Sequence, residues 1–376
     1  MEIETKKNQI IIDEQYMAIA LALAKKGAGF TNPNPMVGAV IVKDGRIIGE
    51  GYHKKYGGPH AEVNAFADAY ERGENTKGAT IYVTLEPCFH YGKTPPCVDL
   101  VLKKEVSRVV IGTLDPNPLV AGQSVTKMKK AGIEVVSGIL KEECLKLNEI
   151  FFQYVTTKKP FVFLKSALSL DGKMTTVTGE SQWISCEESR REVHELRGVY
   201  ASIMVGIGTV LADNPSLTCR LEGKKSPIRI IVDSSLQTPL DANVLKNQDI
   251  AKTIIATTNK ADKEKKKQIE AMDVEVLVVD EKDDHVDLTK LQEVIGERKI
   301  DSVLLEGGAD LAFGAIKAGI VDKVRYYIAP MMLGGQQSKA ALGGEGFEHL
   351  RDAFFLENVT TRQIGQDICI EGYRKK

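Results

Sequence analysis

The sequence lacks several features that mark whole classes of protein. Its 376 residues include only six cysteines and one tryptophan. So few cysteines argue against a disulfide framework and favour a metal-binding or free-thiol role. The net charge is −1, from 50 Lys and Arg against 51 Asp and Glu. Because this balance provides no overall basic field for a polyanion, we expect no nucleic-acid partner.

Long apolar runs are also missing. No stretch reaches the roughly 18 consecutive apolar residues that a membrane helix needs. Residues 1–16 place charges on both sides of a three-residue apolar run, where a signal peptide would have a longer apolar segment. We therefore expect a cytoplasmic protein with no membrane partner.

The composition that is present suits two folded domains. Hydrophobic residues make up 43% of the chain and charged residues 27%, which is ordinary for a globular protein of this length. Asp13 is expected to cap an opening helix that Gly27 ends. Strand and helix patterns then alternate in both halves, which predicts two layered α/β sheets. The polar stretch 156–160 is the predicted boundary, giving domains 1–156 and 160–376.

Four residues of the first half form a pattern typical of a zinc enzyme. His60 and Glu62 stand where a loop gives way to a helix, and Cys88 follows a predicted strand 28 residues after His60. Cys97 is a third candidate ligand. One imidazole and two thiolates leave the fourth tetrahedral position of Zn²⁺ open for water, which indicates catalysis. Glu62 is not needed as a ligand and can move a proton between water and a leaving amine.

The match to the zinc deaminase pattern H-x-E followed by P-C-x-x-C is partial. Eight residues rather than two separate Cys88 from Cys97, and His90 lies between them as a rival ligand. Taken singly, each residue is better explained as a buried histidine, an inert cysteine or a solvated glutamate. The four in this order favour the metal site.

Longer strings in the first half resemble one family. NPNPMVGAVIV, HAEVNA, TLEPCFHYGKTPPC and DPNPLVAG are similar to the bifunctional deaminase/reductase of riboflavin biosynthesis, whose zinc loop has this length. The resemblance implies zinc on His60, Cys88 and Cys97, with Glu62 as the proton shuttle. One departure is Gly-Gln-Ser at Gly122 to Ser124, where the family is expected to show a second glycine. The implied substrate contacts in this half are Asn34, His53, Lys93, Asp115 and Asn117.

The second half continues the resemblance through LKSALSLDGK, SQWIS, VHELR, VGIGTVLADNPSLTCR and LLEGGADL. These strings are similar to the NADPH-dependent reductase of the same family. The implied folds are a cytidine-deaminase-like α/β/α sandwich followed by a dihydrofolate-reductase-like α/β domain. The implied cofactor contacts are Ala167, Trp183, Thr209, Asp213, Ser234, Gly308, Ala309, Asp310, Leu311, Ala312, Phe313 and Gly314. The implied substrate contacts are Ser181, Arg197, Leu217, Arg220 and Glu306. We add Lys165 as a further substrate contact, and we expect Lys165 and Asp213 to organise this site.

The residues themselves are compatible with these roles. Two glycine pairs follow predicted strands, Gly206 with Gly208 and Gly307 with Gly308. Glycines between a strand and a helix let backbone N–H groups approach a phosphate. The spacing is not G-x-G-x-x-G, however, and each pair alone indicates only a tight turn. Arg197 and Arg220 can neutralise a phosphate. Trp183 is either a packing surface for the cofactor or an ordinary core or interface aromatic.

The resemblance implies two consecutive reactions on a phosphorylated pyrimidine. The first is hydrolytic deamination of 2,5-diamino-6-(5-phosphoribosylamino)pyrimidin-4-one. The second is NADPH-dependent reduction of its ribosyl side chain to ribityl. A homo-oligomer, dimer or tetramer, is also implied. The competing hypotheses are a nucleic-acid base deaminase, a catalytically silent zinc-binding or assembly protein, and a chain in which only one half is active.

Overall fold

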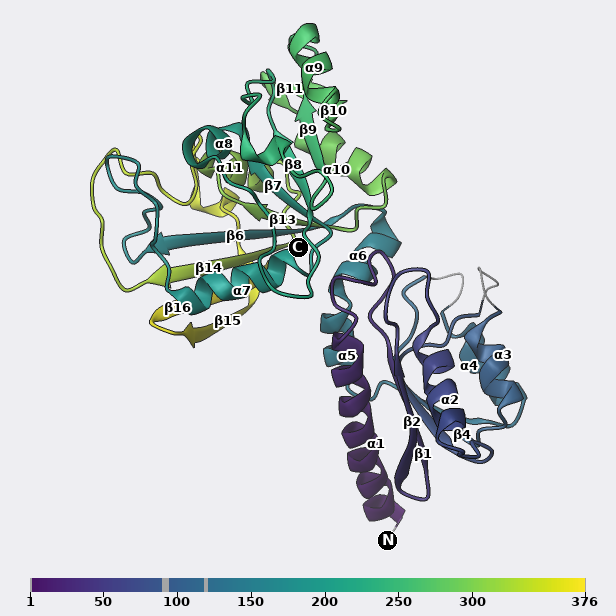
Figure 1. Cartoon of the computed structure of the whole chain (residues 1–376). Helices are drawn as coiled ribbons and strands as arrows, with labels where there is room; N and C mark the ends of the chain where they lie inside the picture. Colours follow the sequence, from purple (N-terminus) through teal and green to yellow (C-terminus); the bar gives the residue numbers. More distant parts are fainter. Residues whose placement is uncertain (1, 90–94, 118–120, 376) are drawn as a thin grey trace. The chain divides into compact units, whose positions relative to one another are not determined.

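The chain forms two compact units, Met1–Thr157 and Lys158–Lys376 (Figure 1). The computed structural model describes residues 2–89, 95–117 and 121–375. Each unit is built around its own β-sheet with helices on both faces. Among the helices of the described residues, none is both long and apolar enough to span a membrane.

The first unit has a five-stranded sheet in the order β2-β1-β3-β4-β5. β1 pairs antiparallel with β2 and β3, whereas β3, β4 and β5 are parallel. Its strands are β1 (Gly38–Lys43), β2 (Arg46–Tyr52), β3 (Thr80–Leu85), β4 (Arg108–Thr113) and β5 (Glu134–Ser137). Its helices are α1 (Glu2–Lys25), α2 (Ala61–Glu71), α3 (Cys97–Lys103), α4 (Gln123–Lys130), α5 (Lys141–Leu147) and α6 (Glu149–Thr157).

Alternation along the strands produces three layers in this unit. Ala39 and Ile41 of β1 pack toward α2, α3 and α4, whereas Val40 and Val42 pack toward α1 and α5. Successive side chains of a strand point to opposite faces, so one apolar strand supplies both cores. Figure 1 shows α1 on one side of the sheet and α2 to α4 on the other.

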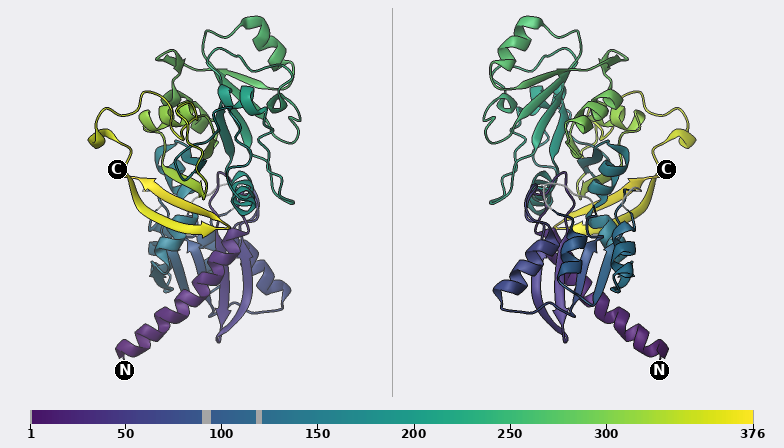
Figure 2. Two further views of the ribbon diagram at one scale, coloured as in Figure 1. Left: turned by 90° about the vertical axis from the view of Figure 1, so that its left-hand side faces the viewer. Right: turned by 90° about the vertical axis from the view of Figure 1, so that its right-hand side faces the viewer.

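The expectation that Asp13 caps the first helix is wrong. Helix α1 begins at Glu2, and Asp13 lies in its middle with a side chain that is 1% exposed. Its carboxylate accepts two hydrogen bonds from Arg108, at 2.7 and 2.8 Å, and a third from the Tyr82 hydroxyl at 3.0 Å. A carboxylate that pairs with a guanidinium from a strand does not need the free N–H groups of a helix end. The helix continues past it, and its N-terminal half projects beyond the sheet (Figure 2).

The second unit has a nine-stranded sheet in the order β10-β9-β8-β7-β13-β6-β14-β16-β15. All neighbours from β10 to β14 are parallel, and the β14, β16 and β15 edge is antiparallel. Its strands are β6 (Phe161–Ser169), β7 (Ser202–Gly206), β8 (Ile228–Val232), β9 (Thr253–Thr257), β10 (Glu275–Val278), β13 (Ser302–Glu306), β14 (Lys323–Ala329), β15 (Leu356–Ile364) and β16 (Asp367–Arg374). β15 and β16 form the two-stranded ribbon seen in yellow in Figure 2. A separate pair consists of β11 (Glu281–Lys282) and β12 (His285–Val286).

Helices cover both faces of this sheet. α10 and α11 pack on one face, whereas α8, α9 and η1 pack on the other, where α7 covers the part near β14 and β16. The helices are α7 (Glu187–Arg197), α8 (Ile207–Asp213), α9 (Lys263–Glu270), α10 (Leu288–Glu297) and α11 (Ala309–Lys317), with short 3₁₀ turns η1 (Asn243–Leu245) and η2 (Leu350–Asp352).

The strand order contains a topological switch point beside β13, where the connections between strands change direction along the sheet. The chain passes from β6 to β7 over the position that β13 later fills, and β8, β9 and β10 then extend the sheet away from it. In open parallel sheets, ligands bind beyond the carboxyl ends of the strands at such a point. The ends of β7 and β13 are therefore where a cofactor site is expected.

Candidate functional site

The first unit brings the three predicted metal ligands together. The ligand atoms of His60, Cys88 and Cys97 all lie within 4.8 Å of one another. His60 immediately precedes α2, Cys88 follows β3, and Cys97 is the first residue of α3. Two helix N-termini and the carboxyl end of a strand thus converge on one point.

The spacing of these atoms fits a tetrahedral zinc ion. The Nδ1 atom of His60 lies 3.6 Å from the Cys88 sulfur and 3.3 Å from the Cys97 sulfur. Zn–N and Zn–S bonds of ordinary length at a tetrahedral angle separate N from S by about 3.6 Å. Hydrogen bonds with Cys97 and His60 lower the pKa of Cys88, which favours the thiolate form of this ligand, whereas the same contact with Cys88 raises the pKa of Cys97.

Glu62 lies in the first turn of α2, close to the metal ligands. Its side chain is 3% exposed, and burial together with the Cys88 sulfur raises its pKa to about 7. The neighbouring Cys88 and Cys97 side chains both influence the ionisation of this carboxyl group. A buried carboxyl next to a metal-ligand set is suited to exchanging a proton with a group bound there.

His53 and Asn34 lie beside this cluster. The His53 ring packs edge to face on His60, with 5.4 Å between ring centres. Its Nδ1 is 3.0 Å from the Pro59 carbonyl, which only accepts, so Nδ1 carries the proton. Nε2 then accepts from the Asn34 amide at 3.2 Å. Burial lowers the pKa of His53, in keeping with this neutral form.

Asp115 and Asn117 follow the carboxyl end of β4, and Cys88 follows the carboxyl end of β3, its parallel neighbour. Both are partly buried, and the Asn117 N–H donates to Asp115 Oδ1 at 2.8 Å. Lys93 and the rival ligand His90 lie outside the described residues.

Sequence reasoning missed Asn148, which lies between α5 and α6. Its buried amide accepts from the Met36 N–H at 2.8 Å and donates to the Met36 carbonyl at 2.9 Å. This pair of bonds fixes the loop that carries Asn34. Nothing in the local sequence signals it, because the two partners are separated by 112 positions.

A buried ion cluster forms the centre of the second predicted site. Glu306, the last residue of β13, accepts from Arg197 Nε and Nη2 at 2.8 and 3.0 Å, and Lys165 Nζ is 3.4 Å away. Although burial opposes ionisation, the two cations hold the pKa of Glu306 at about 2. Arg197 also donates to the Thr218 carbonyl at 3.2 Å, so three of its five N–H groups have protein partners.

Two glycine-capped helix ends lie side by side at the ends of β7 and β13. Gly206 precedes α8 and Gly308 precedes α11, and the two strands are parallel neighbours. Gly307 and Gly308 have φ of +77° and +84°, a conformation that L side chains rarely adopt. A Cβ at Gly307 would lie 3.3 Å from the Thr209 hydroxyl. Paired N-termini with a hydroxyl between them fit the phosphates of a dinucleotide such as NADPH.

The residues from Gly308 to Gly314, all predicted as cofactor contacts, do not all lie at the carboxyl end of β13. Gly308 to Leu311 form the N-terminal turn of α11, with Asp310 accepting from the Gly344 N–H at 3.1 Å. The Ala312 N–H already donates to the Gly308 carbonyl, and the side chains of Ala312 and Phe313 are buried. Only the first turn offers backbone donors to a ligand.

The other predicted residues of this half differ in exposure. Leu217 packs in a core cluster at φ +53°, so only its backbone is available to a substrate. Arg220 and Asp213 are exposed. Trp183 is 63% exposed, with the Arg190 guanidinium 4.7 Å from its ring centre, and is thus not a core residue. The partly buried residues are Ala167, Ser181, Thr209 and Ser234.

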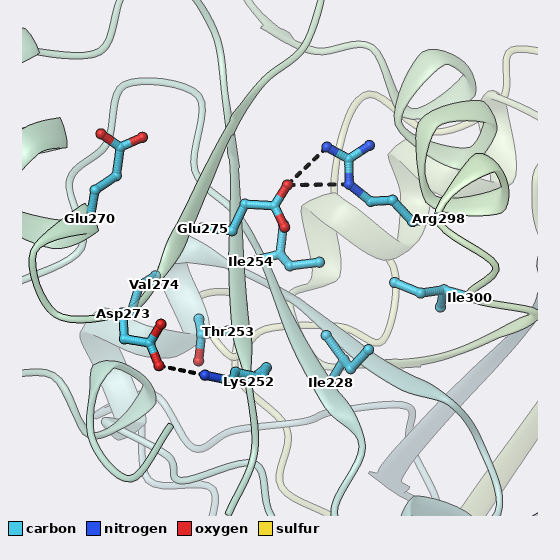
Figure 3. A pocket seen from close by; sticks show the side chains of 10 residues that line it. All are labelled: Ile228, Lys252, Thr253, Ile254, Glu270, Asp273, Val274, Glu275, Arg298 and Ile300. Atoms are coloured by element: carbon cyan, nitrogen blue, oxygen red, sulfur yellow. Dashed lines mark hydrogen bonds and ion pairs between the residues drawn. The ribbon is translucent and has the colours of Figure 1, made fainter. Parts of the chain in front are cut away.

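A cavity of about 510 Å³ in the second unit lies at the amino ends of the parallel strands, opposite to the carboxyl ends of β7 and β13 (Figure 3). It opens beside Ile228 and Thr253, where β8 and β9 begin. Four of its charged side chains pair with one another, Lys252 with Asp273 and Arg298 with Glu275, whereas Glu270 pairs with Lys266 outside the lining. Neither the glycine-capped helices nor the Glu306 cluster lines it.

Two family models match the chain. The model of the RibD C-terminal domain matches residues 160–370, and that of the cytidine and deoxycytidylate deaminase zinc-binding region matches residues 11–113. The second match agrees with the predicted zinc cofactor, and together the models confirm the predicted fold class of two α/β domains.

Relatives of known name match almost the whole chain. It is 49% identical over 359 residues to the riboflavin biosynthesis protein RibD of Actinobacillus pleuropneumoniae, a match that covers 96% of this chain and 94% of that protein. It is 44% identical to the RibD protein of Bacillus amyloliquefaciens, covering 97% of each. The crystal structure of a diaminohydroxyphosphoribosylaminopyrimidine deaminase/5-amino-6-(5-phosphoribosylamino)uracil reductase from Thermotoga maritima is 39% identical, with a TM-score of 0.84 and coverage of 98% and 100%. The chain therefore belongs to the RibD family of riboflavin biosynthesis proteins.

Proposed function

We propose that the chain catalyses two consecutive steps of riboflavin biosynthesis. The first unit deaminates 2,5-diamino-6-(5-phosphoribosylamino)pyrimidin-4-one hydrolytically, and the second reduces the ribosyl side chain of the product to ribityl with NADPH. The observation that carries the proposal is the convergence of His60, Cys88 and Cys97 beside a buried Glu62, in a chain whose other half matches the RibD C-terminal domain. We assign deamination to residues 1–156 and reduction to residues 160–376.

In the first unit, His60, Cys88 and Cys97 would hold the zinc ion. When bound, zinc supplies Lewis-acid activation of water for attack on the ring carbon that bears the amine. Glu62 takes a proton from the water and returns one to the leaving nitrogen, and the other water proton ends on the ring nitrogen, so that the amine-bearing carbon becomes a ring carbonyl and the amine leaves as ammonia. Its burial keeps that proton from exchanging freely with solvent.

Neutral His53 and the Asn34 amide orient the pyrimidine, together with Asp115 and Asn117. The hydrogen bond from His53 Nδ1 to Pro59 fixes the ring, so that Nε2 stays an acceptor. The four side chains offer both donors and acceptors to the polar edge of the ring. From the resemblance we also keep Lys93 as a substrate contact.

In the second unit, the first turn of α11 and Thr209 would hold NADPH, which supplies the hydride. We propose Ala167, Trp183, Asp213 and Ser234 as further cofactor contacts. On the substrate side, Glu306 accepts hydrogen bonds from sugar hydroxyls while Arg197 and Lys165 keep it ionised.

The two cations and one carboxylate of the Glu306 cluster leave one net positive charge, which complements a phosphorylated sugar. Arg220 is exposed and is the more available of the two arginines for the phosphate itself. Ser181 and the backbone at Leu217 complete the proposed substrate contacts.

Separate assays of the two steps test this function. The zinc-loaded protein should release one ammonia per pyrimidine without NADPH, and the zinc-free protein should oxidise NADPH only with the deaminated compound. A zinc chelator should stop the first reaction and spare the second. Ammonia release that survives complete zinc removal, or no turnover of either compound, would contradict the proposal.

We also propose that the enzyme acts in the cytoplasm as a homo-oligomer, a dimer or a tetramer. The proposal is supported by the resemblance described above. Cell fractionation and light scattering of the purified protein test it, and a monomeric mass at micromolar concentration would count against the second part.

A further inference from the structure

Glu86 holds two segments of the first unit together. It follows β3, and its side chain is 4% exposed. Its Oε2 atom accepts from the N–H groups of Asp115 at 3.2 Å and Gly122 at 2.9 Å, and its Oε1 atom accepts from the Ser124 N–H at 3.1 Å. One buried carboxylate thus accepts two backbone donors from the connection between β4 and α4 and a third from the first turn of α4.

The first turn of α4 is also tied to the residue after Glu86. The Ser124 hydroxyl donates to the Pro87 carbonyl at 2.6 Å, and the Glu86 N–H donates to the Thr113 carbonyl at 2.9 Å. Pro87 directly precedes the metal ligand Cys88. The backbone that supplies a zinc ligand and the backbone that carries Asp115 are therefore joined through a few hydrogen bonds.

We propose that Glu86 is a positioning residue for deamination, which sets the substrate-binding residues Asp115 and Asn117 relative to the metal ligands. It holds the Asp115 backbone, and Asp115 in turn accepts from the Asn117 N–H. A catalytic arrangement displaced by about 1 Å can lose a hundredfold in rate, so such a tie affects activity directly. The inference rests on the proposed deaminase function.

The chemistry of the three partners explains why a carboxylate stands here. All three are donors, and an ionised carboxylate only accepts. A glutamine would turn its NH₂ group toward one of these N–H groups, so at least one bond would be lost and two donors would face each other. The shape of the side chain is kept, which makes Glu86→Gln the informative variant.

The deaminase KM for the phosphorylated pyrimidine should rise about tenfold in Glu86→Gln, because one of the three hydrogen bonds is lost and the remaining bonds, which hold the backbone of the substrate contacts, are no longer charge-assisted. The zinc content should remain one per chain, and kcat should fall less than KM rises. Reduction of the deaminated compound by the same preparation should be unchanged and serves as an internal control.

Asp13→Asn is the matched control. Asp13 is also a buried carboxylate of this unit, but it pairs with Arg108 at the opposite end of β4. This variant should lower the melting temperature while KM stays at the wild-type value. If Asp13→Asn and Glu86→Gln changed KM equally, Glu86 would be only a stability residue.

A second variant, Glu86→Asp, tests the positioning role if Glu86→Gln fails to fold. Glu86→Asp keeps the acceptor-only carboxylate but withdraws it by one methylene, so it should bind zinc fully and show an intermediate KM. A wild-type KM in either variant, with wild-type deamination confirmed in parallel, would overturn the positioning role and leave the proposed function intact. An inactive wild-type chain would instead remove the proposed function.

Discussion

The candidate site of the first unit consists of side chains, whereas that of the second unit consists largely of backbone N–H groups. In the first, side chains converge: one imidazole, two sulfurs and a buried carboxyl meet at the ends of α2, α3 and β3. In the second, backbone dominates, since two glycine-capped helix ends lie beside a single ion cluster at Glu306. A site made of side chains shows in the sequence as residue types, whereas a site made of N–H groups shows only as glycines.

The largest effect is expected where one side chain carries a chemical step. Glu62→Gln keeps the size of the side chain but removes the group that exchanges the proton, so deamination should fall by about 10²- to 10⁴-fold. Zinc content and reduction of the deaminated compound should be unchanged. Glu71→Gln, at the exposed end of the same helix, is the control. Substantial deamination by Glu62→Gln would remove the proton-shuttle assignment.

The second unit offers no equivalent single residue, and its most sensitive point is an ion pair. Arg197→Ala leaves the buried Glu306 carboxylate with Lys165 alone, and breaking such a pair costs about 3–5 kcal/mol. The reductase specificity constant and the stability of the second unit should both fall, while deamination persists. Arg197→Lys keeps the charge but not the two-point contact and should lie between. An unchanged specificity constant in Arg197→Ala would show that the cluster is not part of the site.

Sequence can predict the metal ligands because their identities and order carry the chemistry. It can also predict both α/β domains from the alternation of strands and helices. It misplaces Asp13 because the partner Arg108 lies 95 positions away, and an acidic residue ahead of an apolar helix resembles a cap. The sequence does not identify the roles of Asn148 and Glu86, because each side chain binds backbone atoms of a segment that is distant in the sequence. Nor can sequence show where, along the predicted run from Gly308 to Gly314, helical hydrogen bonding begins to use the N–H groups, which happens at Ala312.

Acid should destabilise the second unit through Glu306. Its pKa in the folded chain is about 2, below its ordinary value of 4.5, so its ionisation stabilises the fold above about pH 4.5. That contribution, about 3 kcal/mol, should disappear as the pH falls from about 4.5 toward 2. Wild type should therefore lose its stability advantage over Glu306→Gln across this range.

The single tryptophan makes this measurement specific to one unit. Trp183 belongs to the second unit, so its fluorescence reports unfolding there even when acid releases zinc from the first. Denaturant titrations at several pH values give the free energy of unfolding for each protein. A gap between wild type and Glu306→Gln that stays constant from pH 5 to pH 2.5 would contradict the role of the ion cluster.

The smallest effect is expected at Ser124, in the segment Gly122 to Ser124 where the family is expected to show a second glycine. Its hydroxyl donates one hydrogen bond to the Pro87 carbonyl, while the bond from its N–H to Glu86 is a backbone feature that glycine would keep. Ser124→Gly should therefore cost about 1 kcal/mol of stability in the first unit, with deaminase KM nearly unchanged. Thermal unfolding and steady-state kinetics measure the two quantities. A rise in KM as large as that of Glu86→Gln would mean that the Ser124 hydroxyl sets the distance between the substrate contacts and Cys88 as much as the Glu86 carboxylate does.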